Sequence, residues 1–359
     1  MKKLLLVLLM GLMVCGCSCK KENVKCPNDK GDNTEEVKTI VGNDYTDLYK
    51  KTTTSVVKIV LRNIETRKVN YQGSGVVFYE EGNYAYIITN NHVVSANSRY
   101  LEIEVYFSDE SGNESGKSEI ATLISQDANE DVAVLRINKS DKYKVATIGD
   151  SDKVNIGDFV YTIGSPNDYF NVSTAGYIIS NNILTKYDAN NSGVPVDIYE
   201  LTFSAVISPG NSGGGLFNSK GELIGITTYN HADLTYLYAA LPINFFVKVA
   251  KSILGTGDKY TRPVLNISTL SINSIGVDRT RYGIADNIYT GVYVLESRES
   301  TIPVQSIIVA INGKEIKSTN DLGKELLKYN VGDTIKVTTR YKTGVGETTV
   351  DVVLHSWLK

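Results

Sequence analysis

The chain has 359 residues, of which 42% are hydrophobic and 21% are charged, and its formal net charge is −3 at pH 7. That length is enough for two domains of roughly 100–200 residues each, and the small negative charge excludes a nucleic acid partner held through its phosphates. All of the cysteines lie near the N-terminus, at Cys15, Cys17, Cys19 and Cys26. The rest of the chain therefore has no disulfide framework, no cysteine-ligated zinc site and no cysteine nucleophile.

The first residues are typical of an export signal. Two lysines at positions 2 and 3 precede the apolar run Leu4–Val14, which is too short to cross a bilayer because a helical span takes about 20 residues. The sequence Val14-Cys15-Gly16-Cys17 resembles the lipobox of bacterial lipoproteins, which implies a signal peptide over residues 1–16 and a lipid anchor on Cys17. A plain secretory signal is the alternative. Cys15 is a second candidate for the anchor, disfavoured because Val14 before it is bulky.

Residues 17–45 have a different composition. The stretch Lys20–Lys38 is charged and rich in asparagine, with no apolar periodicity. Such a segment buries too little apolar surface to fold alone, so we expect a flexible tether here.

Alternating apolar residues begin after the tether and continue for about two hundred positions. Short runs rich in Val, Ile and Tyr, such as Ser55–Val60, Gly73–Phe78 and Tyr84–Ile88, are separated by Gly, Asn and Asp. This pattern predicts an all-β sandwich or barrel. Ala239–Leu254 then changes to helical spacing, with Phe245, Val249 and Ile253 on one stripe. We therefore expect a β domain over residues 46–256 that closes with a helix.

Residues 260–359 predict a second, small α+β domain. Ile307–Ile311 is a buried strand that ends at the turn Asn312-Gly313, and Ser318–Asp321 resembles a capping box that opens a helix through about Tyr329. Further strands are expected at Thr334–Thr339 and Thr348–Leu354.

The segment Ser208–Gly215 is the first candidate for chemistry. Its sequence, SPGNSGGG, places Ser212 among glycines, which let the backbone turn so that the N–H groups of Gly210 and Ser212 can point at one spot. A serine hydroxyl is a useful nucleophile only beside a base and with donors for the developing oxyanion. A glycine-rich loop without chemistry is the alternative. A phosphate-binding P-loop is excluded, because no Lys-Ser or Lys-Thr pair follows at the required spacing.

His92 is the candidate base. It follows an apolar strand within Thr89–Val94, so its ring is expected at a strand end rather than deep in a core. A lone histidine is more often structural or exposed, and the other two, His231 and His355, fit that interpretation.

Asp131 is the candidate partner of the histidine. It stands directly before the alternating strand Val132–Leu135, where its carboxylate can reach the Nδ1–H of an imidazole. A surface acid at the start of a strand is the alternative, and Asp127 is the competing acid.

The order of the three signals along the chain is His92, Asp131, Ser212, on an all-β background. Subtilisin-type enzymes run Asp–His–Ser, and α/β-hydrolases run Ser–Asp–His. The chymotrypsin-like double β-barrel uses the order found here. We therefore predict a catalytic triad on an all-β double β-barrel of the chymotrypsin type, followed by the small α+β domain.

From about Tyr45 to Leu354 the sequence resembles the HtrA/Deg family of serine proteases. The motifs that carry the resemblance are Gly73–Val77, Thr89–Val94, Asp131–Leu135, Ile148–Ser151, Val160–Pro166, Ser173–Gly176, Pro209–Gly214 and Leu241–Asn244. The resemblance implies that Ser212 attacks the scissile carbonyl, His92 takes and returns the proton, and Asp131 fixes the imidazole tautomer. It also implies an oxyanion hole from the amides of Gly210 and Ser212, with Asn211 completing the loop. No cofactor or metal is implied.

The resemblance also implies the character of the S1 pocket. Val206 stands six residues before the nucleophile, where trypsin-like enzymes keep an acid. Together with Ile207 and the strand Ile226-Thr227-Thr228, it implies an apolar S1 pocket.

The last module resembles the PDZ domain of the same family, which binds the C-termini of extended peptides by β-addition. Arg262-Pro263 is followed here by Val264-Leu265-Asn266-Ile267, where the family often has Tyr-Leu-Gly-Ile. The usual Gly-Asp before the Ile307 strand is replaced by Gln305-Ser306. Asn is among the few non-glycine residues that tolerate the left-handed conformation, so the loop can keep its shape.

Together these features predict an exported serine endopeptidase, anchored by lipid at the outer face of the bacterial cytoplasmic membrane or in the cell envelope, that cleaves unfolded or damaged polypeptides. A lipid-anchored holdase chaperone and a PDZ interaction scaffold are the alternatives, although neither needs Ser212. The family commonly forms trimers, for which Tyr45 and Tyr49 are candidate packing residues.

Overall fold

The computed structural model describes residues 42–356 apart from 97–98, 188–195, 231–236, 257–259, 275–276 and 300. The predicted signal peptide, the lipidation candidate Cys17 and most of the tether lie outside the described residues. The first described helix, α1 (Gly42–Thr52), starts inside the range assigned to the tether. It forms because Tyr45, Leu48 and Tyr49 recur at helical spacing and pack on the core of the barrels.

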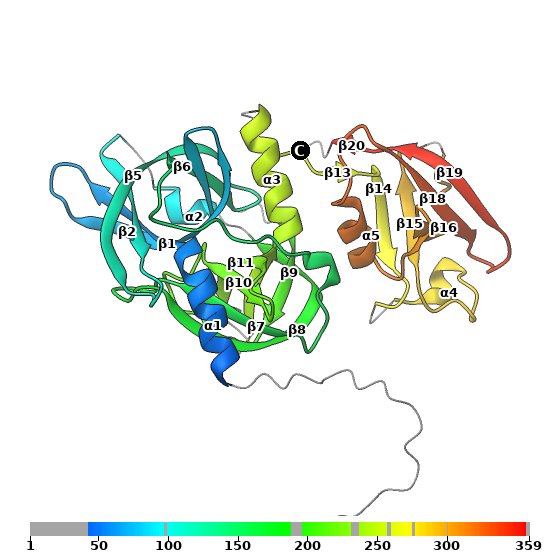
Figure 1. The fold of residues 1–359 in the computed structure, drawn as a ribbon. Helices are drawn as coiled ribbons and strands as arrows, with labels where there is room; N and C mark the ends of the chain where they lie inside the picture. Colours follow the sequence, from blue (N-terminus) through cyan, green and yellow to red (C-terminus); the bar gives the residue numbers. More distant parts are fainter. Residues whose placement is uncertain are drawn as a thin grey trace, which may run out of the picture. The chain divides into compact units, whose positions relative to one another are not determined.

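Two closed antiparallel barrels of six strands each make up most of the fold (Figure 1). The first has the order β1-β2-β3-β6-β5-β4 and the second β10-β11-β12-β9-β8-β7. The predicted chymotrypsin-like double barrel is confirmed. The strands of the first barrel are β1 (Val56–Asn63), β2 (Val69–Glu81), β3 (Tyr84–Thr89), β4 (Leu101–Ser108), β5 (Glu114–Asp127) and β6 (Val132–Asn138). Those of the second are β7 (Phe159–Gly164), β8 (Val172–Tyr187), β9 (Val196–Phe203), β10 (Gly215–Asn218), β11 (Leu223–Asn230) and β12 (Tyr238–Pro242).

Side chains alternate along the strands of the two barrels, and this alternation divides the barrels' apolar residues among three cores. One face of the first barrel's strands fills its interior, with Val57, Ile87 and Leu135 fully buried. The interior of the second barrel contains Phe203 and Leu216. The third core lies between the barrels, where residues that point out of both barrels meet. The catalytic candidates lie at this junction, His92 on a short helix and Asp131 and Ser212 on loops, so the packing of the two barrels sets their relative positions.

The helix α3 (Ile243–Thr256) covers the core between the barrels and is shorter than predicted. Phe246, Val249 and Ile253 are fully buried on one stripe. The residues Ala239–Pro242, predicted as the first turn of this helix, instead form β12, which pairs with β9 and β11. Closure of the second barrel needs this strand, and its backbone pairing outweighs the helical spacing.

The C-terminal module is built on a sheet whose strands have the order β14-β15-β16-β18-β19, with β17 beside β16. The strands β13 and β20 form a separate pair. The predicted capping residue Ser318 accepts a hydrogen bond from the Asp321 amide at 3.2 Å, and the helix that follows ends three residues earlier than expected. The elements are β13 (Pro263–Val264), β14 (Ile267–Ser271), β15 (Val292–Ser297), β16 (Ser306–Ile311), β17 (Lys314–Glu315), α5 (Thr319–Leu326), β18 (Thr334–Tyr341), β19 (Glu347–Val353) and β20 (His355–Ser356).

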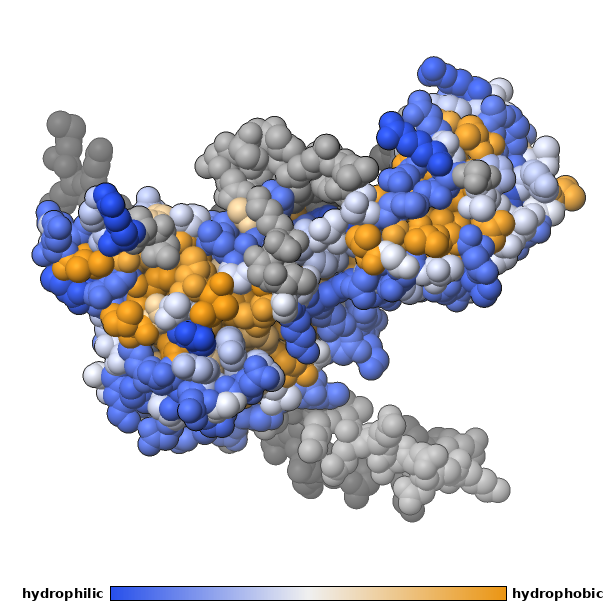
Figure 2. Space-filling view, turned by 90° about the horizontal axis from the view of Figure 1, so that it is seen from above, coloured by the Kyte–Doolittle hydropathy of each residue, from blue (hydrophilic) through white to orange (hydrophobic). Residues whose placement is uncertain are grey.

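Four short helices complete the described chain. They are α2 (Asn91–Val94), α4 (Arg279–Tyr282) and the 3₁₀ turns Thr53–Ser55 and Ser151–Lys153. Within the described residues, no helix is long and apolar enough to cross a membrane. Seen from above, apolar residues gather in patches bordered by hydrophilic ones on both the barrels and the C-terminal module (Figure 2).

Candidate active site

His92 and Asp131 form a hydrogen-bonded pair at the junction of the barrels. The imidazole Nδ1 lies 2.9 Å from Oδ2 of Asp131 and 3.1 Å from Oδ1. The backbone N–H of His92 also donates to Oδ1 at 2.9 Å. The carboxylate is fully buried, whereas 30% of the histidine side chain is exposed. Asp131 therefore holds the ring in position, and with the proton on Nδ1 the other ring nitrogen, Nε2, can accept a proton.

Local backbone geometry explains how the pair forms. His92 lies on the short helix α2, which follows the end of β3 after the single residue Asn90, and not on the strand itself. Asp131 precedes β6 with a φ of 55°, which is uncommon for non-glycine residues but more frequent for aspartate than for most of them. The side-chain amide of Asn90 donates from Nδ2 to the Asp131 carbonyl at 3.2 Å and joins the two segments.

Two opposing effects set the protonation of His92. Burial disfavours the charged imidazolium and lowers its pKa, but the negative charge of Asp131 and the hydrogen bond to it act in the other direction and prevail. The pKa of His92 is therefore raised above its ordinary value of 6.5. A raised pKa makes the ring a better proton acceptor, as a general base requires.

Ser212 lies on a tight loop between β9 and β10. The carbonyl of Ser212 accepts a hydrogen bond from the Ser74 amide at 2.8 Å, which ties the loop to β2 of the first barrel. Gly213, with a φ of 85°, has no room for a side chain because a Cβ would overlap the Ser74 carbonyl oxygen. The Ser212 hydroxyl donates to the carbonyl of Thr228 at 2.7 Å. It must rotate away from this carbonyl before it can donate to His92.

Three backbone N–H groups, those of Gly210, Asn211 and Ser212, are candidates for the oxyanion hole, and they differ in whether they already form a hydrogen bond. The N–H of Asn211 donates to the Ser208 carbonyl at 2.9 Å. The N–H groups of Gly210 and Ser212 form no hydrogen bond within the described part of the chain. Gly210 has a φ of 100°, and its carbonyl accepts from the Ser74 hydroxyl at 2.8 Å. Asn211 therefore supports the loop, and the two neighbouring amides are available to an oxyanion.

The residues expected around S1 have different environments. Val206 is exposed, while Ile207 lies at the edge of the second barrel's core. Ile226 is fully buried in the core between the barrels, so its side chain does not face a substrate pocket. The Thr227 hydroxyl donates to the Asn211 carbonyl at 2.7 Å and holds the serine loop in place.

Thr228 has a role that the sequence did not indicate. Its carbonyl accepts the Ser212 hydroxyl, and its own hydroxyl lies 3.3 Å from Oδ2 of Asp131. One residue of β11 thus touches both the nucleophile candidate and the acid. Ser74 and Asn90 stand in the motifs Gly73–Val77 and Thr89–Val94, but no role was assigned to either. Nothing in a single sequence shows which distant residue a hydroxyl or an amide will reach.

The competing titratable residues have other partners. Asp127 accepts hydrogen bonds from the amides of Asn129 and Glu130, at 2.9 and 3.1 Å. His355 pairs with Glu299 at 2.8 Å. His231 lies outside the described residues. The candidate trimer residues form hydrogen bonds within the chain. The Tyr45 hydroxyl shares a hydrogen bond with the Ser173 hydroxyl at 2.6 Å, and the Tyr49 hydroxyl donates to the Asn171 carbonyl at 2.7 Å.

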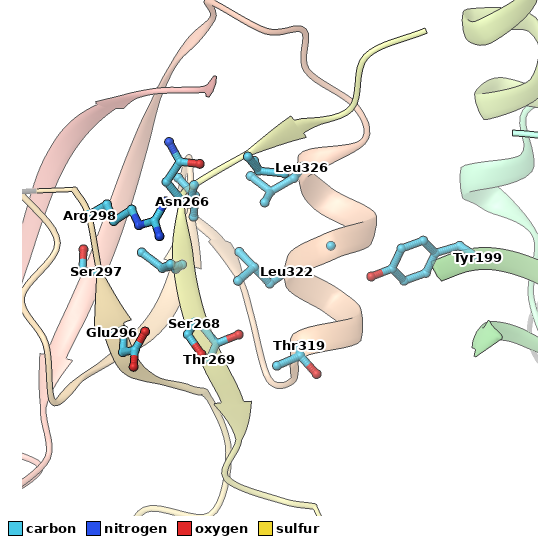
Figure 3. A pocket seen from close by; sticks show the side chains of 14 residues that line it. Tyr199, Asn266, Ser268, Thr269, Glu296, Ser297, Arg298, Thr319, Leu322 and Leu326 are labelled. Carbon is cyan, nitrogen blue, oxygen red and sulfur yellow. The ribbon is translucent and has the colours of Figure 1, made fainter. Parts of the chain in front are cut away.

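The loop Val264–Ile267 borders a groove of about 760 Å³ in the C-terminal module (Figure 3). Asn266 has a φ of 52°, the left-handed conformation that the expected glycine would adopt easily. Leu322 and Leu326 of α5 line the side opposite β14, and the Arg298 side chain lies close to Asn266. The groove thus combines the two leucines of α5 with Arg298 beside the loop, and its lining also includes Glu296 and several hydroxyl side chains.

Comparison with known proteins places the chain in a family. Residues 73–226 match the family described as trypsin-like peptidase domain. The serine protease Do-like HtrB of Bacillus subtilis is 33% identical over 286 residues, which is 75% of this chain and 60% of that protein. The chain belongs to the HtrA/Deg family of serine proteases. The serine protease Do-like HtrA of Lactococcus lactis subsp. lactis is 29% identical over 297 residues, 78% of this chain and 70% of that protein.

Solved structures of bacterial serine proteases share the fold. The HtrA-type protease AlgW with a tripeptide superposes with a TM-score of 0.64 and 22% identity, over 88% of this chain and 98% of that one. The serine endoprotease from Yersinia pestis gives a TM-score of 0.56 and 23% identity, over 87% and 98%. This HtrA/Deg chain spans only 60% of the length of HtrB.

Proposed function

We propose that this HtrA/Deg chain is a serine endopeptidase in which Ser212 is the nucleophile, His92 the general base and Asp131 the residue that orients the base. The observation that carries the proposal is the buried Asp131 carboxylate, which binds both the ring and the amide of His92. Two further contacts, of Thr228 with Ser212 and with Asp131, support the grouping of all three.

The proposed reaction begins when the Ser212 hydroxyl leaves the Thr228 carbonyl and turns to Nε2 of His92. His92 takes the proton as the serine oxygen adds to the scissile carbonyl, and the resulting oxyanion accepts hydrogen bonds from the amides of Gly210 and Ser212. The imidazolium then donates its proton to the leaving amine, which leaves an acyl-enzyme. Water repeats the two steps to release the new carboxylate and restore the serine.

The test uses unfolded casein and a fluorophosphonate probe. Wild-type protein should cleave casein and be labelled at Ser212, and Ser212→Ala should lose several orders of magnitude in kcat/KM. Undiminished cleavage by Ser212→Ala would contradict the triad. If casein is held in solution without cleavage by both proteins, the holdase chaperone is the better description, and a chain that neither cleaves nor holds casein would favour the scaffold.

We further propose an apolar S1 pocket that prefers small aliphatic residues before the scissile bond. The exposed Val206 takes the place where trypsin-like enzymes keep an acid. The preference should be modest, because one methylene changes the free energy by only about 1–3 kcal/mol. Mapping of cleavage sites tests this, and a predominance of Arg or Lys would refute it.

We propose that the groove of the C-terminal module is a PDZ-like site for the free C-terminus of a polypeptide. The left-handed Asn266 and the neighbouring Arg298 support binding of a carboxylate, and Leu322 and Leu326 support an apolar last side chain. The proposed cellular role is the quality control of exported proteins at the cell envelope. Relatives described as probable periplasmic serine endoproteases favour an exported location.

A further inference from the structure

A tight turn joins β5 to the proposed catalytic aspartate. Residues 127–131, the aspartate turn, begin at Asp127, whose fully buried Oδ1 accepts from the amides of Asn129 and Glu130. The turn ends at Asp131, whose φ of 55° is uncommon for a non-glycine residue, although aspartate tolerates it better than most. A conformation of this kind persists only where its surroundings enforce it.

A segment far along the chain binds the aspartate turn at two points. The linker segment, residues 260–262, follows α3. The amide of Tyr260 donates to Oδ2 of Asp127 at 2.8 Å. The guanidinium of Arg262 donates to Glu130 with both Nε, at 2.7 Å, and Nη2, at 2.5 Å. Glu130 is only 3% exposed, so this two-bond ion pair forms out of water, where its geometry is strongly specified.

The linker segment is itself held by α3. The ring of Phe245 stands edge-on to Tyr260, with centroids 5.9 Å apart, and the Arg262 guanidinium lies 5.7 Å from the same ring. Burial acts to lower the pKa of Arg262, but the hydrogen bonds and charge of Glu130 outweigh it and raise the pKa. The arginine therefore stays charged, and it is fixed between a core helix and the aspartate turn.

We infer that Tyr260 and Arg262 are positioning residues for catalysis: the linker segment holds the aspartate turn in the conformation that presents Asp131 to His92. Neither residue touches His92 or Ser212 in any described contact. The inference rests on the proposed role of the triad. It extends that role to a segment about 130 positions away in sequence, immediately before the groove of the C-terminal module.

Loss of the Arg262–Glu130 pair should have a specific signature. A buried Glu130 without its partner would draw water or move, and the aspartate turn would move with it. Asp131 supplies the negative charge that raises the pKa of His92. The other charged groups in or against the aspartate turn are Asp127, Glu130 and Arg262. Displacement of Asp131 should therefore lower both kcat and the pKa of His92.

The experiment compares Arg262→Gln with Arg262→Lys in the full chain, by steady-state kinetics on casein-derived peptides and by NMR titration of the imidazole of His92. Arg262→Gln should lower kcat about ten- to hundredfold, the usual cost of a misplaced catalytic group, with little change in KM. It should also move the pKa of His92 downwards, and Arg262→Lys, which keeps the charge, should restore part of both losses.

The matched control is Arg62→Gln, which breaks the partly buried Arg62–Glu104 pair of the first barrel, 2.8 Å long in the wild type. It should lower the melting temperature and leave kcat per labelled serine and the His92 titration unchanged. If Arg262→Gln behaves like this control, the positioning role is wrong. The NMR readout separates the two proposals, because a lowered pKa of His92 in a protein without proteolysis would support the positioning and contradict the proposed function.

Discussion

The Asp131 carboxylate makes more contacts than orientation of a ring requires, because it binds the amide of His92 as well as Nδ1. Its charge raises the pKa of His92. As the proposed base, His92 acts when neutral, so the acidic limb of kcat/KM should lie above pH 6.5. The protonated pair also stabilises the fold below pH 6.5, and this contribution should be lost as pH rises through the raised pKa of the folded protein.

Asp131→Asn should remove both effects. An amide cannot compensate an imidazolium and favours the wrong tautomer, so kcat should fall by about four orders of magnitude, as the equivalent change does in trypsin-like enzymes. The residual acidic limb should move to lower pH. A pH–rate profile of the variant checks this, and an unchanged profile would show that another group sets the pKa of His92.

Gly213 tests the serine loop. In Gly213→Ala the new Cβ would overlap the Ser74 carbonyl oxygen and the Thr89 hydroxyl, at a φ of 85°. We expect a loss of unfolding free energy of at least about 3 kcal/mol from overlap and backbone strain, and loss of probe labelling. Gly82→Ala is the control, since its φ is 56° and its surroundings are open. It should cost only about 1 kcal/mol in urea unfolding.

At the scale of elements, α3 joins the two barrels. Phe246 of α3 is fully buried in the core to which both barrels contribute. Phe246→Ala should therefore cost about 3–5 kcal/mol of unfolding free energy. Lys251→Ala, on the exposed side of the same helix, should change it by less than about 0.5 kcal/mol. Equal effects in urea unfolding would mean that α3 does not hold the barrels together.

The groove between β14 and α5 depends on the loop around Asn266. Glycine would adopt the observed left-handed conformation at no steric cost. It would also remove a side chain that we expect to crowd the carboxylate of a bound peptide. Asn266→Gly should then tighten binding of peptides with an apolar free C-terminus several-fold. Calorimetry in the Ser212→Ala background measures this without cleavage. Amidated peptides are the control, and equal affinity for free and amidated termini would rule out carboxylate recognition.

At the scale of the whole molecule, location depends on the N-terminal residues that lie outside the described chain. If Cys17 carries acyl chains, each buried CH₂ contributes about 0.8 kcal/mol, and more than one chain anchors the protein stably. Cys17→Ser should release it from membranes. The intact mass of the mature N-terminus decides the matter, because an unmodified start would contradict lipidation. The trimer stays a prediction, and analytical ultracentrifugation would test it by measuring the mass of the assembly in solution.

The sequence alone determined the order His92, Asp131, Ser212, the all-β background and the cap at Ser318, because strand alternation, glycine content and capping are local signals. It misplaced Ala239–Pro242, where four residues fit a helix or a strand and only closure of the second barrel decides. Tertiary structure alone decided that Thr228 touches both Ser212 and Asp131, and that Arg262 reaches Glu130. These contacts join positions far apart in the chain, and a local pattern does not specify its distant partner.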